Sequence, residues 1–420
     1  MKVAILGSGG REHALCYSLK KSNKVSEIFS IPGNAGTASI SENININLDD
    51  FNEIKNFIIK SKIDLVIIGP EKPLVEGLVD FLNKNNIKVF GPNKNASQLE
   101  GSKIFTKALC KKNNIPTAGY GIFESKEAAI HFINKSNHPI VVKADGLAAG
   151  KGVYICENIQ QSTNAVNEIF DGKFGVAEKV LVEEFLEGEE MSFFIIADGK
   201  NFKKFGTAQD HKRVNEGDKG KNTGGMGCYS PSRLENAILD KKIINKIIKP
   251  TLDGLKKMNI SFSGFLYAGL MIVKNEPFLI EYNVRMGDPE CQTILPRLKT
   301  DFAEIVLSIV NQNLDEIKIE WHKEKSICIV LCSKGYPDEF ENHIEIKKLD
   351  TIELKSNEFV FHAGTKLDNK IVFSNGGRVL NFVNLCKDFK IGRNALINLI
   401  NQLNWGNGFF RKDIGYKVID

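Results

Sequence analysis

The sequence lacks the features that mark secreted, membrane-spanning and redox-active proteins. Its eight cysteines include no pair with the two-residue spacing of a zinc or redox site. The first residues, MKVAILGSGG, place four apolar residues before glycine, too few for the core of a signal peptide. No apolar run approaches the length of a membrane span. We therefore expect a cytoplasmic protein with reduced, buried cysteines and no membrane partner.

A large excess of charge of one sign is also lacking. Lys and Arg number 56 and Asp and Glu number 51, a net charge of +5, and the basic residues are scattered. The densest basic stretch, 241–249, interleaves lysines with isoleucines at helical spacing, which is typical of the solvated side of a packed helix. This balance suits a small anionic substrate, and we expect no nucleic-acid partner.

The first hundred residues carry the rhythm of a parallel sheet covered by helices. A chain of 420 residues is too long for one core, so several packed units are expected. Short apolar runs alternate with helical patterns, and each run ends in a turn rich in glycine or proline. The runs lie at 3–6, 28–31, 64–69 and 87–90. In such sheets ligands bind beyond the carboxyl ends of the strands.

The rest of the chain divides into a middle part with unusual loops and a strand-rich end. Two stretches, 206–220 and 221–231, are predicted to be long polar loops, which inside a compact domain are usually functional or disordered. From about 325 the apolar runs resume and a helix is expected near 388–403, which we interpret as a separate α+β unit. The strand candidates there are 327–332, 358–365 and 376–383.

The turn at 7–10, GSGG, suggests a dinucleotide site only at first sight. The dinucleotide fingerprint requires glycine at position 12, where this chain has Glu12. It also expects an acidic residue at the end of the second strand, where Ser30, Ile31 and Pro32 stand. A nicotinamide enzyme is therefore disfavoured. The turn can still offer backbone N–H groups to a single phosphate, and a tight turn without a ligand is equally compatible.

Residues 140–153, IVVKADGLAAGKGV, give the strongest local signal. A strand ends in Lys143, a glycine-rich loop carries Lys151, and a second strand begins at Gly152. The segment lacks the P-loop pattern and returns as a strand rather than opening a helix. Its N–H groups and two ammonium groups could fold over phosphates. We interpret it as a loop that closes over a nucleotide.

Two acidic segments follow. Glu183 and Glu190 flank a short connector, 185–188, that could present backbone groups to an adenine and a carboxylate to a ribose, although alone such a segment is more often a surface acidic patch. Glu281 and Asn283 lie two apart on a predicted strand and so project from one face, as hard ligands suited to Mg²⁺. Arg285 continues that face and could grip a phosphoryl or carboxylate group.

Between these segments, Asp210, His211, Lys212 and Arg213 cluster in the first polar loop. The second polar loop supplies three glycines, whose missing side chains permit close backbone approach to a ligand. They are Gly224, Gly225 and Gly227. A single histidine such as His211 is more often structural than functional.

Taken in order, these motifs resemble the ATP-grasp superfamily and, more narrowly, the phosphoribosylamine–glycine ligase family. The matching stretches extend over nearly the whole chain. They are GSGGREHAL, PGNAGT, GPEKPLVEG, LEGSKIFTK, VVKADGLAAGKGV, EEFLEGEEMSF, AQDHKR, NTGGMGCYSP, SGFLYAGLM, EYNVRMGDPE, VFHAGTKL, NGGRVL and FRKDIG. Tyr282 and Met286 look like tolerated variation beside the ligands.

The resemblance implies a fold of class α/β and α+β with several domains. A parallel-sheet α/β domain would cover 1–101, an ATP-grasp domain 102–315 with a mobile lid at about 120–188, and an α+β domain 325–420. It implies a monomer that joins glycine to 5-phosphoribosylamine, with ATP and Mg²⁺ or Mn²⁺, through glycyl phosphate. This would be the second step of de novo purine synthesis.

The resemblance also assigns residues. ATP would contact Lys107, Lys143, Gly146, Gly150, Lys151 and Gly152 through its phosphates, Glu183 and the Leu186 backbone through its adenine, and Glu190 through its ribose. The metal would bind Glu281 and Asn283, and the substrates would meet Gly9, Gly10, Lys212, Arg213, Gly225, Gly227 and Asp288. The catalytic residues would be Arg285, Lys143 and Asp210. The sugar phosphate would lie at Gly9 and Gly10 with Arg378 or Arg411.

Two alternatives remain open. One is a different ATP-grasp ligase, such as a carboxyaminoimidazole ribonucleotide synthetase, which would use bicarbonate instead of glycine. The other is a nucleotide-binding sensor that releases no ADP with any substrate. The complete set of lysines and metal ligands argues against the sensor.

Overall fold

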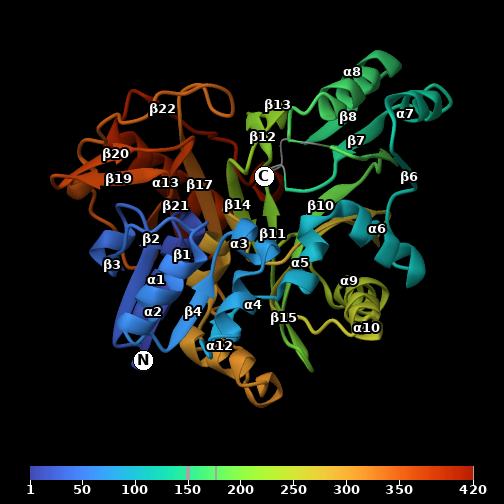
Figure 1. Ribbon diagram of the computed structural model, residues 1–420. Coiled ribbons are helices and arrows are strands. Elements are labelled where there is room, and N and C mark those ends of the chain that lie inside the picture. The colour runs from blue at the N-terminus through green and yellow to red at the C-terminus, as the bar shows by residue number, and fades with distance from the viewer. Residues whose placement is uncertain (148–151, 176, 420) are drawn as a thin grey trace.

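A five-stranded parallel sheet forms the amino-terminal part of the computed structural model, which describes residues 1–147, 152–175 and 177–419 (Figure 1). Its strand order is β3-β2-β1-β4-β5. The strands are β1 (Lys2–Gly7), β2 (Glu27–Pro32), β3 (Glu42–Asn43), β4 (Leu65–Ile68) and β5 (Val89–Phe90). The helices are α1 (Gly10–Lys20), α2 (Phe51–Lys60), α3 (Glu71–Glu76), α4 (Leu78–Asn83) and α5 (Lys94–Gly101). The predicted parallel α/β sheet is confirmed, and β3 is an edge strand that the apolar pattern did not indicate.

A smaller antiparallel sheet of order β6-β9-β7-β8 projects from the body, at the upper right of Figure 1. We call this sheet and its two helices the lid. The strands are β6 (Tyr120–Phe123), β7 (Ile140–Ala144), β8 (Val153–Cys156) and β9 (Val180–Glu184), and the helices are α7 (Lys126–Ile133) and α8 (Ile159–Phe170). Helix α6 (Lys103–Lys112) leads into it. The strand ending at Lys143 and the strand after Gly152 therefore form as the sequence indicates.

One nine-stranded antiparallel sheet joins the middle of the chain to its end. Its order is β16-β15-β10-β11-β14-β17-β21-β18, with β22 paired to β17. The strands are β10 (Glu189–Asp198), β11 (Phe202–Asp210), β14 (Gly227–Ser230), β15 (Ser263–Val273), β16 (Glu276–Asn283), β17 (Lys325–Ser333), β18 (Glu358–His362), β21 (Arg378–Cys386) and β22 (Gly408–Phe409). Two hairpins accompany it, β12 (Arg213–Asn215) with β13 (Lys219–Asn222) and β19 (Thr365–Asp368) with β20 (Ile371–Ser374). We refer to everything outside the lid as the body.

The remaining helices and short turns belong to the body. The helices are α9 (Ala237–Ile243), the π-helical segment η2 (Ile244–Ile248), α10 (Lys249–Lys257), α11 (Glu290–Ile294), α12 (Phe302–Val310) and α13 (Phe389–Leu403). The 3₁₀ turns are η1 (Thr37–Ser39), η3 (Leu295–Arg297), η4 (Leu314–Glu316), η5 (Leu349–Thr351) and η6 (Tyr416–Val418). Among the residues that the structure describes, no helix is both long and apolar enough to cross a membrane.

One expectation about the middle of the chain needs correction. Residues 206–231 are not two long loops, because β11 continues to Asp210 and the β12–β13 hairpin and β14 follow. Strand β11 lies between β10 and β14. The buried side chains of Thr207 and Gln209 on this strand form hydrogen bonds with Ser232, Arg233 and Glu235. The expected carboxyl-terminal α+β unit is present, and its strands continue the nine-stranded sheet, since β17 pairs with β14 from Gly227↔Ile329 to Ser230↔Ser326.

Three clusters of buried apolar side chains stabilise these parts. Two large clusters each contain residues from the amino-terminal sheet and the nine-stranded sheet, and one of them also includes β17, β21 and α13. The third belongs to the lid alone, from Ala129 to Val182. All eight cysteines are free and buried, as predicted. The body is therefore packed as one unit, and the lid has a core of its own.

Candidate active site

The turn after β1 is closed by the carboxylate of Glu12. Its Oε2 accepts the Gly9 N–H at 2.6 Å and its Oε1 accepts the Arg11 Nε–H at 2.6 Å. A Cβ at Gly69, in the turn after β4, would lie 2.0 Å from Oε1, so the carboxylate fills the space between the two turns. Glu12, which stands where the dinucleotide fingerprint requires glycine, therefore caps helix α1 with a side chain from the first turn of the helix itself.

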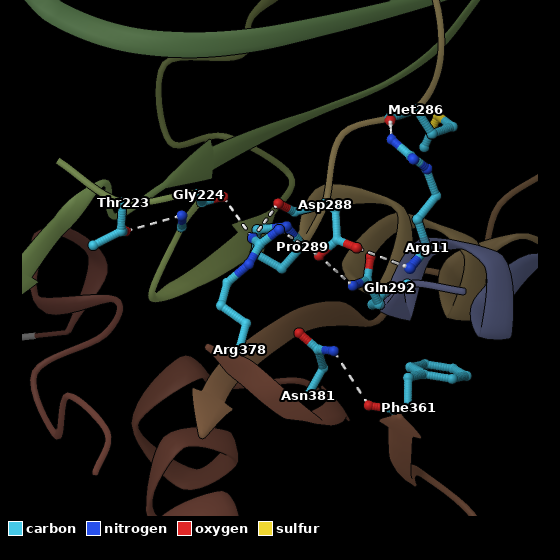
Figure 2. A network of polar contacts seen from close by, with 12 residues as sticks. Arg11, Thr223, Gly224, Met286, Asp288, Pro289, Gln292, Phe361, Arg378 and Asn381 are labelled. Carbon is cyan, nitrogen blue, oxygen red and sulfur yellow. Dashed lines mark hydrogen bonds and ion pairs between the residues drawn. The ribbon is translucent and has the colours of Figure 1, made fainter. Parts of the chain in front are cut away.

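Gly10 lies where three parts of the chain meet. A Cβ there would be 2.4 Å from both Asn381 Nδ2 of β21 and Gln292 Nε2 of α11, so no larger residue fits without displacement. The next N–H, of Arg11, donates to Asp288 Oδ2 at 3.1 Å (Figure 2). The predicted sugar-phosphate turn thus has two of its N–H groups paired with carboxylates, those of Glu12 and Asp288.

Arg378 connects two of the predicted substrate segments (Figure 2). Its Nη1 donates to the carbonyl oxygens of Gly224 and Asp288, both at 2.5 Å, and its Nη2 lies 3.3 Å from Asp288 Oδ1. Burial opposes the charged guanidinium, but Asp288 together with Tyr336, Cys332 and Asp210 more than offsets this and raises the pKa of Arg378. Asp288, Gly224 and the turn at Gly9 and Gly10 are thereby brought together.

Arg411, the other candidate for the sugar phosphate, is already bound to other residues of the chain. Its side chain is 1% exposed, binds Asp413 through two nitrogens at 2.8 and 2.7 Å, and donates to Asp218 at 2.8 Å. It also donates to the carbonyl oxygen of Arg213 at 2.9 Å. The structure therefore places Arg411 behind the β12–β13 hairpin as its anchor.

His211 is also structural, as a lone histidine usually is. Its Nε2 accepts the Gly415 N–H at 3.1 Å, and its Nδ1 lies 3.3 Å from the Gly227 carbonyl oxygen. Burial lowers the pKa of His211 to about 4, with a further contribution from Arg411. The neutral ring links β14 to the end of the chain.

Lys107 of α6 and Lys143 of β7 meet at one carboxylate. Glu183 Oε1 lies 3.2 Å from Lys107 Nζ, and Glu183 Oε2 accepts from Lys143 Nζ at 3.0 Å. Lys107 also donates to Thr117 Oγ1 at 2.6 Å. The resemblance assigned Glu183 to adenine, but the structure places its side chain between the two lysines predicted to bind the phosphates. Leu186 remains in the connector between β9 and β10, half-buried.

The root of the glycine-rich loop is fixed by its neighbours. Gly146 has a φ of +90°, which favours glycine, and its carbonyl oxygen accepts from Lys103 Nζ at 2.9 Å. The Gly152 carbonyl oxygen accepts the Ala144 N–H at 2.9 Å. The predicted contacts at Gly150 and Lys151 lie outside the described residues.

Glu281 and Asn283 share one face of β16, since Glu281 pairs with Gly269 and Asn283 with Tyr267 of β15. Burial opposes ionisation of Glu281, but Lys212, Lys143 and nearby cations more than compensate and lower its pKa. From the described part of the chain, no cation comes within 4 Å of this carboxylate, and no group of three or more acidic, His or Cys side chains could hold a metal alone.

A carboxylate held ionised without a direct partner, beside an amide oxygen, fits a hard divalent cation that takes its remaining ligands from phosphates and water. The chemistry of this donor set therefore agrees with the metal site that the sequence predicts.

Arg285 lies just beyond the metal face but is held by two carboxylates. Its Nη2 donates to Glu100 at 2.7 Å, its Nε lies 3.4 Å from Glu71, and its Nη1 donates to the Met286 carbonyl oxygen at 3.3 Å. Sequence reasoning missed Glu71, Glu100 and Lys103. Glu71 and Glu100 stand in the quoted stretches GPEKPLVEG and LEGSKIFTK, which were the available signal.

Asp210 at the end of β11 has an unusual environment. Its Oδ1 is buried without a hydrogen-bond partner among the described residues. A Cβ at Gly225 would lie 2.7 Å from this oxygen, so the glycine permits the close approach of the backbone. Burial and the nearby Glu290 raise the pKa of Asp210. Lys212, two residues on, pairs with Glu190 at 2.7 Å.

Family models match three consecutive parts of the chain. The model described as phosphoribosylglycinamide synthetase, N domain, matches residues 1–100. The model of the ATP-grasp (A) domain of the same enzyme matches 101–291, and that of its C domain matches 326–417.

Full-length relatives agree with these matches. A phosphoribosylamine–glycine ligase of Brucella melitensis is 44% identical over 421 residues, which cover 100% of this chain and 99% of the relative. The crystal structure of a phosphoribosylamine–glycine ligase from Thermotoga maritima has a TM-score of 0.86 at 33% identity, covering 99% and 100% of the two chains.

A more distant structure shares the fold. A biotin carboxylase domain from Hydrogenobacter thermophilus, in complex with MgADP and bicarbonate, has a TM-score of 0.69 at 16% identity and covers 95% of this chain and 89% of its own. At that identity the likeness extends to the fold alone.

Proposed function

The chain belongs to the phosphoribosylglycinamide synthetase family of ATP-grasp ligases, and from this premise we propose which of its residues perform each part of the reaction. It catalyses the ATP-dependent ligation of glycine to phosphoribosylamine in purine biosynthesis. The proposal concerns the chemical path and the residues along it. The observation that carries it is the convergence of Lys107 and Lys143 on one carboxylate, two ammonium groups fixed together in the ATP-grasp domain.

The reaction needs an activated carboxylate. An amine cannot displace oxide from a carboxylate, whereas it can displace phosphate from an acyl phosphate. We propose that a glycine carboxylate oxygen attacks the γ-phosphorus of ATP, forming glycyl phosphate and releasing ADP. The amine of phosphoribosylamine then attacks the acyl carbon, the C–N bond forms, and the C–O bond to phosphate breaks. The amine loses a proton and inorganic phosphate leaves.

The triphosphate is held by Lys107, Lys143 and the loop that contains Gly146, Gly150, Lys151 and Gly152. Two nearby ammonium groups neutralise charge that moves onto the leaving ADP. The support for this placement is that both lysines are almost fully buried yet point at the same carboxylate. The Leu186 backbone, in the connector that follows β9, meets the adenine, and Glu190 meets the ribose.

Glu281 and Asn283 would hold Mg²⁺ or, through the same oxygen donors, Mn²⁺. When bound, such a cation would supply positive charge to the phosphates of ATP. The residues themselves keep a carboxylate and an amide oxygen fixed on one face of β16, next to Arg285. Because Glu71 and Glu100 bind Arg285, its guanidinium acts as a fixed positive charge beside the reacting phosphoryl group.

Glycine and the sugar amine occupy the body side of the site. Burial and Glu290 oppose ionisation of Asp210, whose Oδ1 has no hydrogen-bond partner among the described residues, so the ammonium group of glycine would supply the missing donor and counter-charge. Lys212 attracts its carboxylate. Phosphoribosylamine contacts Gly9, Gly10, Asp288 and Arg378, and the backbone from Arg213 to Gly227 closes the glycine site.

The path of oxygen tests this mechanism. Glycine labelled with ¹⁸O in its carboxylate should pass one labelled oxygen to the released phosphate, measured by mass spectrometry under full turnover. Unlabelled phosphate would defeat the acyl-phosphate path and indicate hydrolysis of ATP by water. Bicarbonate in place of glycine is the control, because ADP release with it would favour a different ATP-grasp ligase.

A further inference from the structure

Glu183 and the two lysines that it faces are almost fully buried in the candidate ATP site. The Glu183 side chain is 4% exposed, and those of Lys107 and Lys143 are 3% and 5% exposed. Each carboxylate oxygen faces a different lysine, at 3.2 and 3.0 Å. Lys143 donates a hydrogen bond to Oε2, whereas Oε1 accepts no hydrogen bond from the described residues and is ion-paired with Lys107. Two ammonium groups therefore compete with any adenine amino group for this carboxylate.

Two buried ammonium groups side by side are costly without a counter-ion, because burial and mutual repulsion both favour loss of a proton. Burial lowers the pKa of Lys107, Lys143 lowers it further, and Glu183 acts in the opposite direction. The other groups around Lys107 supply no charge. They are the ring of Tyr120 at 5.1 Å, the hydroxyl of Thr117, the Ala118 carbonyl oxygen and the Cys110 thiol.

The triad also spans two parts of the molecule. Lys143 and Glu183 lie in the lid sheet, where Val141 pairs with Glu183, whereas Lys107 lies in α6 at the base of the lid. Glu183 therefore fixes the position of one lysine relative to the other. Two phosphate-binding lysines that are already held at a fixed spacing bind a triphosphate without a further entropic cost of ordering their side chains.

We infer that Glu183 is a positioning residue, which keeps Lys107 and Lys143 charged and correctly spaced before the triphosphate binds, and that it does not recognise adenine. This inference rests on the proposed function, in which those two lysines bind the phosphates of ATP. With Glu183 ionised, the triad carries one net positive charge instead of two.

The test compares Glu183→Gln with Glu184→Gln in the full-length chain. Glu184 is the exposed neighbour, whose carboxylate accepts the Gly119 N–H at 2.8 Å and touches neither lysine in the described contacts. The measurement is the Kd of the non-hydrolysable analogue AMP-PNP with Mg²⁺ between pH 7 and pH 9, and the pH profile of kcat/KM for ATP.

In Glu183→Gln we expect binding to weaken about tenfold or more between pH 7 and pH 9, because a lysine now loses its proton in this range. The unaltered chain and Glu184→Gln should change less than about threefold over that range. A Glu183→Gln variant with the unaltered pH dependence would overturn the inference. So would a loss of preference for ATP over GTP without a change in pH dependence, since that result assigns Glu183 to adenine.

Glu183→Asp provides a second variant if the amide prevents folding. It keeps the charge and shortens the reach, so the basic limb of the pH profile should stay in place while the KM for ATP rises several-fold; an unchanged KM would contradict the positioning role. Lys107→Ala and Lys143→Ala distinguish a failure of the proposed ATP site from a failure of the role inferred for Glu183. If neither weakens AMP-PNP binding, the proposed ATP site is itself incorrect. If both weaken it and Glu183→Gln does not, only this inference fails.

Discussion

The lid and the carboxyl-terminal strands are both attached to the same body, but by different kinds of contact. The lid has its own apolar cluster, and polar contacts join its β7 end to α6, such as Ser102 Oγ to Asp145 and Lys103 Nζ to the Gly146 carbonyl oxygen. The carboxyl-terminal strands instead continue the body sheet through β14 and β17 and share one apolar cluster with it. A part held by polar contacts can shift without opening a core, whereas a part that shares a core cannot.

This difference matches the division of the proposed chemistry. The proposed metal ligands Glu281 and Asn283 and the carboxylate Asp210 lie on strands of the body sheet, where packing fixes them. Lys143 and Glu183 lie on the lid. The fixed part would hold the atoms that react, and the attached part would bring charge to the phosphates and exclude water.

The largest effect should come from a ligand on the fixed sheet. Glu281→Gln should lower kcat about a thousandfold or more, because a neutral amide binds and neutralises a divalent cation less well. Steady-state kinetics at saturating ATP and Mg²⁺ measure it, with circular dichroism to verify folding. Glu276→Gln is the matched control on the same strand, since that exposed carboxylate pairs with Lys242 and Lys246. Near-normal kcat in Glu281→Gln would remove Glu281 from the metal site.

A matched pair of core substitutions tests the separation directly. Ile329 in β17 and Ile169 in α8 are both 0% exposed. Replacement of either by Ala should lower the free energy of unfolding of the part in which it packs by about 2–5 kcal/mol. Ile329→Ala should lower the stability of the whole body. Ile169→Ala should increase hydrogen exchange in residues 120–184 and leave residues 325–386 protected. Equal exchange in both segments after Ile169→Ala would mean that the lid and the body unfold together.

Acid should destabilise the body more than the lid. Burial lowers the pKa of His13 to about 3 and those of His211 and His362 to about 4, and all three lie in the body. The unfolded chain binds these protons near pH 6.5, so stability is complete above that pH and falls as the pH decreases toward 4. The loss is roughly 1.4 kcal/mol per histidine for each pH unit.

Urea unfolding at pH 7 and pH 5, monitored by hydrogen exchange, measures this loss. His362→Gln should reduce the slope of stability against pH between these values. If the lid segment loses protection first on acidification, the assignment of acid sensitivity to the body is incorrect.

The smallest effect should come from the surface of the lid. Lys126 and Asp171 pair at 2.5 Å with side chains 33% and 66% exposed, and solvent screens such pairs. Lys126→Ala should therefore change the thermal unfolding of the lid by less than about 1 kcal/mol. A double-mutant cycle with Asp171→Asn measures the pair alone, and a coupling above 2 kcal/mol would show that surface charge contributes to lid stability.

Local sequence patterns predicted the parts of the fold whose signal is local. The apolar runs at 3–6 and 64–69 became β1 and β4, because strands buried on both faces need continuous apolar residues. The spacing of Glu281 and Asn283 correctly placed both on one strand face. Strand β13, with the sequence KGKN, carries no such signal, since it is short, polar and exposed. Pairing of β14 with β17 is invisible for another reason, because the partners lie about a hundred residues apart.

The same limit applies to the candidate site. Gly150 and Lys151 could be proposed from a glycine-rich pattern, but the partner of a charged residue depends on tertiary packing. The resemblance assigned Glu183 to adenine, and nothing near Glu183 in sequence indicates its partner Lys107, which comes from α6. Arg411 of FRKDIG was a candidate for the sugar phosphate. Nothing near it in sequence indicates Asp218, with which it forms an ion pair.

The order of strands in the body sheet also affects the synthesis of the chain. Strand β14 ends at Ser230, but its neighbour β17 begins at Lys325. At about 5–20 residues per second, a ribosome needs about 5–20 s to make the intervening residues. During that interval the edge of β14 has unpaired N–H and C=O groups that another strand could pair with. A nascent chain stalled in this interval should therefore need a chaperone more than one stalled after β17 has emerged.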